Sequence, residues 1–200
     1  MKARFIVLSL AIAATARGDQ QTIDPVAAAT PQVVDALTGV DFPNAAGEID
    51  AQRASLDALL GTDPVSSLAA IADADAQIPS GVRIRALRAL ALYDTDPARA
   101  ALRTAIAKHG ASTSGIDLLE LRAAIEGLGL IGDATDVATI VPFLDKEESR
   151  DIRSAAARAL RDIGSTTAIA PLHARLTKEK VAQVQFWISD ALRVLSVTPS

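Results

Sequence analysis

The sequence contains no cysteine and few aromatic residues, and both absences narrow the possible folds and activities. Without cysteine, the 200-residue chain has no disulfide framework, thiolate metal site, thiol nucleophile or lipidated cysteine anchor. Aromatic residues make up 3% of a chain that is half apolar, so its core is built from Ala, Leu, Val and Ile. Because strands favour β-branched and aromatic residues, the composition predicts an almost entirely helical protein.

Basic residues are scarce in the N-terminal third of the chain. Between Asp19 and Ser80, ten acidic residues accompany the single basic residue Arg53, whereas from Gly81 onward sixteen basic residues nearly balance fourteen acidic ones. The formal net charge of −4 argues against nucleic-acid binding, which requires a basic face. The uneven charge either orients a partner or a neighbouring copy of the chain, or is simply a solvated surface.

The N-terminal segment is apolar but short. Two basic residues precede an apolar stretch at residues 5–13, which is too short to span a bilayer as a helix, and the small-residue motif A-T-A follows at residues 14–16. This order predicts a signal peptide at residues 1–18, cleaved after Ala16 or Gly18, and an exported protein that is periplasmic or secreted. A buried first helix is the alternative, and an uncleaved signal would form a membrane tether.

A leucine, a second apolar residue three positions later and then a turn recur along the chain at intervals of 32 to 38 residues. The turns contain Gly, Asp, Ser or Thr, which end one helix and begin the next. A further apolar residue follows twelve positions after the leucine, on a second helix. This period predicts stacked pairs of antiparallel helices. The leucines are Leu56, Leu90, Leu128, Leu160 and Leu192, and the residues on the second helices are Leu68, Leu102, Ile140 and Leu172.

The predicted fold class is all-α: a right-handed α-solenoid of about four and a half helical hairpins at residues 49–200. Residues 19–48 contain three prolines and are predicted to be an extended lead-in with one candidate short helix in PQVVDALTG. The predicted helix pairs are 50–61 with 64–74, 82–93 with 96–108, 117–131 with 134–145, and 150–163 with 166–177, followed by a single helix at 181–195.

The repeated segments carry a family resemblance. They include VRIRALRALALYDTDPARAAL, LRAAIEGLGLIGDATDVATIVPFL and IRSAAARALRDIGSTTAIAPLHARL. These segments resemble HEAT repeats of the short bacterial type, also called phycobilisome-lyase HEAT-like repeats, well over residues 80–195 and more weakly over 50–75. The resemblance is specific for the fold and weak for function.

Four charged residues are candidates for a structural clamp between repeats. Arg153 lies seven residues before Leu160, at the buried edge of its helix, and Asp145 lies eight residues upstream of Arg153. The same spacing relates Arg83 to Asp75. At the two equivalent positions that lack arginine, the residue eight upstream is also neutral, so the acid and the base are expected to pair across the turn between repeats. The family resemblance implies the same clamp for Asp145 with Arg153.

A second column of charges lies two residues before each leucine. Its members, Arg88, Glu126, Arg158 and Asp190, alternate in sign from one repeat to the next. Helices of neighbouring repeats pack roughly 10 Å apart, which is within reach of a contact between arginine and a carboxylate. The column predicts a charge ladder that favours the correct stacking register. Arg161 is expected on the solvated face or in the last turn of its helix as a partner of the helix dipole.

Patterns that support catalysis or metal binding are scarce. The two histidines, His109 and His173, have no Glu or Asp at the spacing of metal ligands on a helix. The serines at 112, 114 and 154 have no neighbouring base. The sequence therefore predicts no enzyme activity, no cofactor and no metal.

Candidate partner-binding residues fall in two places. The second helices of the pairs are predicted to line the concave binding face of the solenoid, where Arg103, Val141 and His173 point outward among small residues. On the last helix, Phe186 and Trp187 lie where earlier repeats carry alanines. These two aromatic residues form either a terminal cap or a partner-binding patch.

The leading interpretation is a non-catalytic, exported scaffold or adaptor that binds another protein. No nucleic acid is expected as a partner, and no membrane unless the signal segment stays uncleaved. One alternative is an enzyme accessory or lyase-like HEAT protein, suggested by the name of the repeat class. Another is a self-assembling subunit that joins its acidic N-terminal third to the Trp187 end of the next copy.

Overall fold

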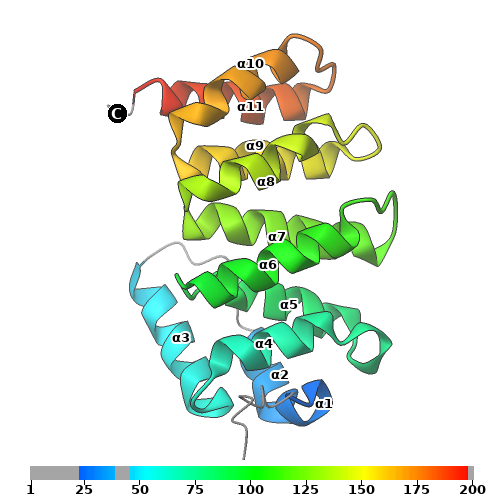
Figure 1. Cartoon of the computed structure of the whole chain (residues 1–200), viewed down its shortest axis with the longest axis vertical. Coiled ribbons are helices and arrows are strands. Elements are labelled where there is room, and N and C mark those ends of the chain that lie inside the picture. Colours follow the sequence, from blue (N-terminus) through cyan, green and yellow to red (C-terminus); the bar gives the residue numbers. More distant parts are fainter. Residues whose placement is uncertain (1–22, 39–45, 198–200) are drawn as a thin grey trace, which may run out of the picture.

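A computed structural model describes residues 23–38 and 46–197 of the chain, and the predicted signal peptide at 1–18 lies outside these residues. The described residues form helices joined by short turns, as the composition predicted (Figure 1). No helix within 23–38 or 46–197 has the length and hydropathy of a membrane-spanning segment. The α-helices are α1 (Pro25–Ala28), α2 (Pro31–Thr38), α3 (Ala46–Leu60), α4 (Pro64–Asp73), α5 (Ser80–Leu90), α6 (Asp96–His109), α7 (Ile116–Ile131), α8 (Val137–Ile140), α9 (Arg150–Ile163), α10 (Ile169–Leu176) and α11 (Ala182–Leu195).

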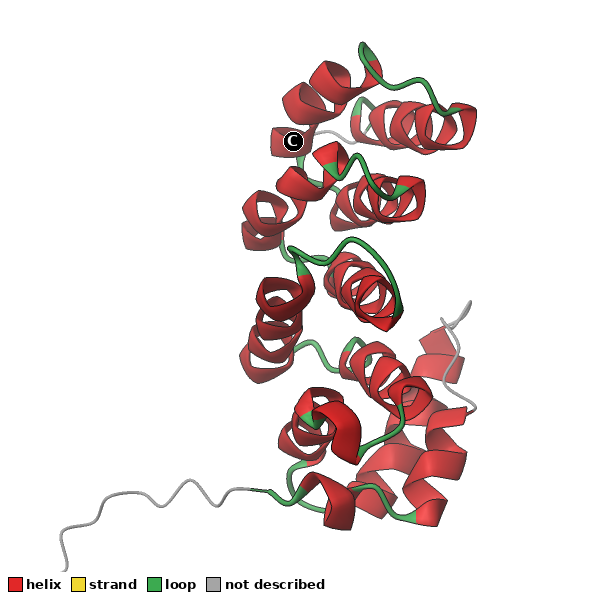
Figure 2. Cartoon of the chain, turned by 90° about the vertical axis from the view of Figure 1, so that its right-hand side faces the viewer, coloured by secondary structure: helices red, strands yellow, loops and turns green. Residues whose placement is uncertain are grey.

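The helices stack in two layers, which appear as two columns in the side view (Figure 2). The first-helix layer consists of α5, α7, α9 and α11, and each of these helices packs against the next. The second-helix layer consists of α4, α6, α8 and α10, which lie in front in Figure 1. This arrangement confirms the predicted α-solenoid.

Turn residues begin and end the helices as their chemistry requires. The side chains of Asp63, Thr95 and Ser149 accept hydrogen bonds from backbone N–H groups in the first turns of α4, α6 and α9. Gly132 and Gly164 follow α7 and α9 in the left-handed conformation, with φ of 81° and 74°. Local sequence therefore determines where each repeat turns.

The repeated apolar residues form one continuous core between the two layers. All five leucines of the repeat are at most 7% exposed, and the residues twelve positions later are fully buried. Because each helix places an apolar stripe toward its neighbours, no repeat can bury its core residues alone.

The second helix of the third pair is less regular than predicted. Residues 134–145 form the 3-10 segment η2 (Ala134–Asp136), the single turn of α8 and the 3-10 segment η3 (Val141–Asp145). Pro142 lies in η3. Proline has no backbone N–H and disrupts a continuous α-helix, which explains the change at this point.

The lead-in predicted at residues 19–48 is more helical than expected in the part that the structure describes. Residues 25–28 and 31–38 form α1 and α2, and Val33 and Leu37 of α2 are buried in the core. Pro25 and Pro31 occupy the first positions of these helices, where their fixed φ favours a helix start. The short helix expected in PQVVDALTG is α2.

The first predicted pair also differs from the later ones. Helix α3 runs at an angle to the stack (Figure 1), and α2 packs against α5 in its place. Leu59 of α3 is accordingly 42% exposed, whereas its equivalent in the next repeat, Tyr93, is buried. The Tyr93 hydroxyl donates a hydrogen bond to Asp57 of α3 over 2.9 Å, and burial together with this bond raises the pKa of Tyr93.

Small residues set the spacing between α7 and α9. A Cβ atom added to Gly129 would lie 2.6 Å from Cα of Ala159, a distance that backbone atoms do not tolerate. Ala123, Ala124 and Ala155 are also buried in this layer. The two helices therefore approach as closely as their backbones permit.

We expect Gly129→Ala to lower the free energy of unfolding by about 1–3 kcal/mol, because the added methyl group forces α7 and α9 apart. Gly81→Ala is the matched control, since nothing lies within 4 Å of a Cβ atom at that position of α5. The control is expected to leave stability unchanged or slightly raised. Urea unfolding of both variants tests this, and equal stabilities would contradict the close approach.

Candidate functional site

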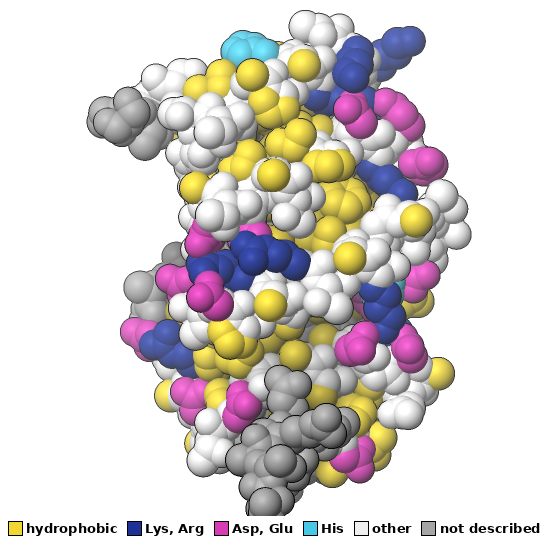
Figure 3. All heavy atoms as spheres, in the orientation of Figure 1, with side chains coloured by type: hydrophobic (Ala, Val, Ile, Leu, Met, Phe, Trp, Pro, Cys, Tyr) yellow, Lys and Arg dark blue, Asp and Glu magenta, His cyan; other side chains and the backbone are white. Residues whose placement is uncertain are grey.

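The outer face of the second-helix layer is lined mainly by small side chains. Figure 3 shows hydrophobic side chains spread over this face, interrupted by groups of charged residues. Small side chains leave a surface on which another polypeptide could approach the helices closely. The exposed small residues of this layer include Ala100, Thr104, Ala138, Ala170 and Ala174.

A groove of about 300 Å³ separates α4 from α6 on this face. Leu87 of α5 contributes to its lining, and one end of the groove carries Lys108 and His109. The groove is mainly apolar because alanines of both helices and Leu87 form more than half of its lining. Its lining consists of Ala69, Ala70, Ala72, Asp73, Leu87, Ala101, Thr104, Ala105, Lys108 and His109.

Lys108 provides a charged group at the end of the groove. Its Nζ atom lies 2.6 Å from a carboxylate oxygen of Asp73 and 2.8 Å from one of Asp75. Burial lowers the pKa of Lys108, but the hydrogen bonds to the two carboxylates outweigh it and raise the pKa. The lysine therefore stays protonated at physiological pH.

The predicted partner-binding residues on the second helices do not converge. Arg103 is tied to the turn before α8, because its guanidinium pairs with buried Asp136 and donates to the Thr135 hydroxyl. Val141 is partly buried against the core, whereas His173 is exposed on α10. None of Arg103, Val141 and His173 lines the groove.

Trp187 and Phe186 have different environments on α11. The guanidinium carbons of Arg158 and Arg161 lie 5.2 and 5.6 Å from the centre of the Trp187 ring, within the range of cation–π contact. Trp187 also packs against the core, while Phe186 meets it edge-on and is 61% exposed. The geometry favours a cap role for Trp187 and leaves Phe186 accessible to a partner.

The predicted charge ladder is present at one step and shifted at the next. Arg158 pairs with Glu126 of the preceding repeat, as expected. Asp190, however, pairs over 2.9 Å with Arg161 and over 2.6 Å with Arg193. Arg161 lies in the last turn of α9, one of its two predicted roles, and it also reaches across to the next helix of the layer, which the sequence did not predict.

The predicted clamp between Asp145 and Arg153 is wrong. Arg153 is 4% exposed and pairs with buried Glu179 over 2.8 Å, and its Nη1 donates to the carbonyl oxygens of Lys146 and Glu147 at 3.0 Å. The exposed Asp145 carboxylate lies 3.1 Å from Arg175 and 3.1 Å from Lys178 instead. The buried Arg153 guanidinium thus binds two carbonyl oxygens of the loop and the Glu179 carboxylate, while the Asp145 side chain is exposed to solvent.

Arg83 makes the equivalent set of contacts one repeat pair earlier, so the predicted pairing with the Asp75 side chain is also wrong. Its guanidinium donates to the backbone carbonyl oxygens of Asp75 and Ile78, and pairs with Glu120 over 2.6 Å. The Asp75 carboxylate contacts Lys108. Arg83 and Arg153 therefore each form what we call an arginine clip: two carbonyl oxygens that precede the helix and one buried carboxylate further along the chain.

Glu179 is the carboxylate of the second clip, and its pKa is strongly lowered there. Burial raises its pKa, but hydrogen bonds from Arg153, the backbone N–H of Val181 and Arg175 outweigh burial and lower the pKa to about 2. The carboxylate therefore remains ionised at neutral pH.

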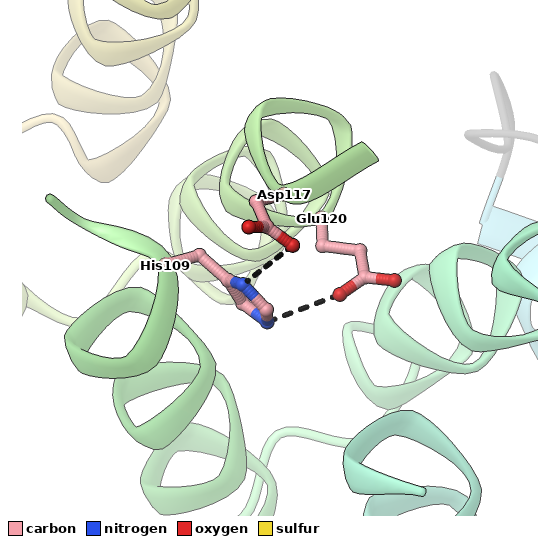
Figure 4. A group of neighbouring side chains, drawn as sticks. All are labelled: His109, Asp117 and Glu120. Carbon is pink, nitrogen blue, oxygen red and sulfur yellow. Dashed lines mark ion pairs between the residues drawn. The ribbon is translucent and has the colours of Figure 1, made fainter. Parts of the chain in front are cut away.

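His109 lies among carboxylates that the sequence prediction did not place near it. Its Nε2 atom is 3.0 Å from Glu120 and its Nδ1 atom is 3.5 Å from Asp117 (Figure 4). These partners belong to α7, across the loop at residues 110–115, so no spacing along one helix reveals them. One ligand atom from each of the three residues lies within 4.8 Å of the others, a grouping that could hold a metal ion.

Comparison with known proteins finds a family model that matches part of the chain. Residues 119–193, which extend from α7 into α11, match the family model for HEAT repeats. The match is to HEAT repeats in general and does not specify the phycobilisome-lyase type. No curated protein matches the chain in a sequence search.

The Glu179 carboxylate is expected to make stability depend on acid. Its folded pKa of about 2 is below the ordinary 4.5, so the pairing stabilises the fold above pH 4.5 and is lost as the pH falls toward 2. At pH 7, Glu179→Gln should lower the free energy of unfolding by about 3 kcal/mol, because Arg153 stays buried without a counter-charge. The variant should also lose stability less steeply between pH 4.5 and 2.

Chemical unfolding of the wild type and the variant at several pH values measures both effects. Glu148→Gln is the control, since Glu148 is an exposed carboxylate of the loop before α9, whose carbonyl oxygens Arg153 binds. It should unfold like the wild type. A loss below about 1 kcal/mol in Glu179→Gln would contradict the clip.

Trp187→Ala is expected to lower the free energy of unfolding by about 2 kcal/mol, through lost packing and lost contacts with Arg158 and Arg161. Phe186→Ala should change it by less than about 0.5 kcal/mol, because Phe186 is largely exposed. Thermal unfolding compares the two variants. Equal effects would show that Trp187 does not act as the cap.

Proposed function

Since this is a HEAT-repeat protein, with the matched repeats at residues 119–193, we propose that it is a non-catalytic, exported scaffold or adaptor for another protein. HEAT repeats in general mediate protein–protein interaction. The observation that carries the proposal is the alanine-lined groove between α4 and α6, which opens on the outer face of the second-helix layer.

The groove suits a peptide segment better than a small metabolite. Its volume of about 300 Å³ is at the lower limit of ligand pockets, and an apolar side chain of a partner would fill much of it. Lys108 at its end is held by Asp73 and Asp75, so the apolar side chains of the groove are left to contact the segment. An extended or helical segment with one apolar anchor therefore fits this surface.

The export and the absence of catalysis are supported by the sequence. Residues 1–18 have the basic, apolar and small-residue order of a signal peptide. The chain has no cysteine, and its serines lack a neighbouring base in sequence. The partner is thus an exported protein, or the exported part of one.

Self-assembly is the second candidate function, and one specific observation favours it. Phe186 is 61% exposed on α11, although large apolar side chains are usually covered. A second copy could cover it with its acidic N-terminal third. Sedimentation at increasing concentration separates this function from that of a monomeric adaptor.

Thr104→Arg is expected to reduce partner capture at least about tenfold, because arginine fills the groove at an exposed position of α6. The immobilised protein is incubated with extract from the exported fraction of its own cells, and bound proteins are identified. Ser189→Arg is the matched control, since it adds the same charge at an exposed position of α11. Capture that is equal in the two variants would contradict the groove as the binding site.

A further inference from the structure

The cluster of His109, Asp117 and Glu120 has the donor set of a transition-metal site. Each residue presents one ligand atom, and these atoms lie within 4.8 Å of one another. Zn²⁺ binds histidine nitrogen and carboxylate oxygen at about 2.0–2.2 Å, which places neighbouring ligands about 3.4 Å apart. The Asp117 oxygen that faces Nδ1 has to turn toward Nε2, which faces Glu120, and Asp117 can do so because its side chain is 55% exposed.

Both carboxylates are held by hydrogen bonds that leave one oxygen directed at His109. One oxygen of Glu120 is bound by Arg83, whose Nε lies 2.9 Å away, and the other faces His109 Nε2. One oxygen of Asp117 accepts a hydrogen bond of 3.2 Å from the Ser112 hydroxyl, and the other faces His109 Nδ1. Metal-binding carboxylates commonly have such outer partners, which orient the ligand before the ion arrives.

The charge of the cluster favours a cation. Arg83 neutralises Glu120, so with a neutral imidazole the Asp117 carboxylate leaves one net negative charge. His109 and Glu120 are buried, whereas Asp117 is open to solvent and provides a path of entry. The neighbouring cation Lys108 is paired with Asp73 and Asp75, so its charge is directed toward these two carboxylates.

We propose that His109, Asp117 and Glu120 bind one divalent transition-metal ion of the Zn²⁺ class. His109 contributes one ring nitrogen, and Asp117 and Glu120 contribute one carboxylate oxygen each. His109 ends α6, while Asp117 and Glu120 lie in the first turns of α7, so the ion joins two successive repeats. His109 also lines the groove between α4 and α6, and the ion therefore fixes one wall of that groove. The site does not depend on the proposed function.

The composition makes the test selective. The chain has two histidines and no cysteine, so imidazole ligands for zinc come only from His109 and His173. His173 is exposed on α10, outside the cluster. His173→Gln is therefore a matched control for His109→Gln.

The experiment is a calorimetric titration of the full chain, without a histidine tag, with ZnCl₂. We expect one Zn²⁺ per chain, an affinity reduced at least about tenfold in His109→Gln, and no change in His173→Gln. Asp117→Asn serves as a second variant, because Asp117 is exposed and its replacement should not affect folding. It should weaken zinc binding by a similar factor, with an unchanged circular dichroism spectrum.

Zinc should also shift the imidazole NMR signals of His109 and leave those of His173 in place. Ca²⁺ at the same concentration should bind more weakly, because it prefers a full set of oxygen ligands. The absence of saturable zinc binding would overturn the proposal. Equal affinity in the wild type, His109→Gln and Asp117→Asn would overturn it as well, by assigning the zinc to other surface carboxylates.

Discussion

The stack of repeats depends on a buried arginine that donates hydrogen bonds to backbone carbonyl oxygens of the loop between two helix pairs. The loops before α5 and α9 present carbonyl oxygens with no helical partner, and each such group is costly if left unpaired. Arg83 and Arg153 bind two of these carbonyls and a carboxylate of the following repeat. One side chain thus connects the end of one repeat, the body of the second and the start of the third, because arginine has enough donors for all three.

The junctions along the first-helix layer are consequently of two kinds. Arg83 of α5 pairs with buried Glu120 of α7, and Arg153 of α9 pairs with buried Glu179 in the loop before α11. From α7 to α9 the arginine position is occupied by Leu121, and the helices meet through Gly129 and Ala159. The junction from α7 to α9 has no clip and combines close packing with the pair of Arg158 and Glu126. Acid is therefore expected to weaken mainly the junctions that contain a clip. A packing defect at Gly129 is expected to weaken mainly the junction between α7 and α9.

The repeat itself could be predicted from the sequence, because its information is local. Leu128 and Leu160 are buried where the period places them, and Gly132 and Gly164 end the helices that they follow. The partners of the charged residues could not be predicted in this way. The sequence suggested Asp145 because it is close to Arg153 along the chain. Glu179 is 26 residues from Arg153 and becomes its neighbour only after the helices pack. The contacts of His109 were missed because they cross a loop.

The alternation of junctions also restricts how such a chain can grow. In the first clip Glu120 lies within α7, whereas in the second Glu179 lies in the loop between α10 and α11. A copy of α5 and α6 alone would therefore repeat Arg83 without its carboxylate. A copy of α9 and α10 with the loop that follows would carry Arg153 and Glu179 together. A chain of this kind can thus grow by one repeat from the second clip, but it needs two repeats from the first.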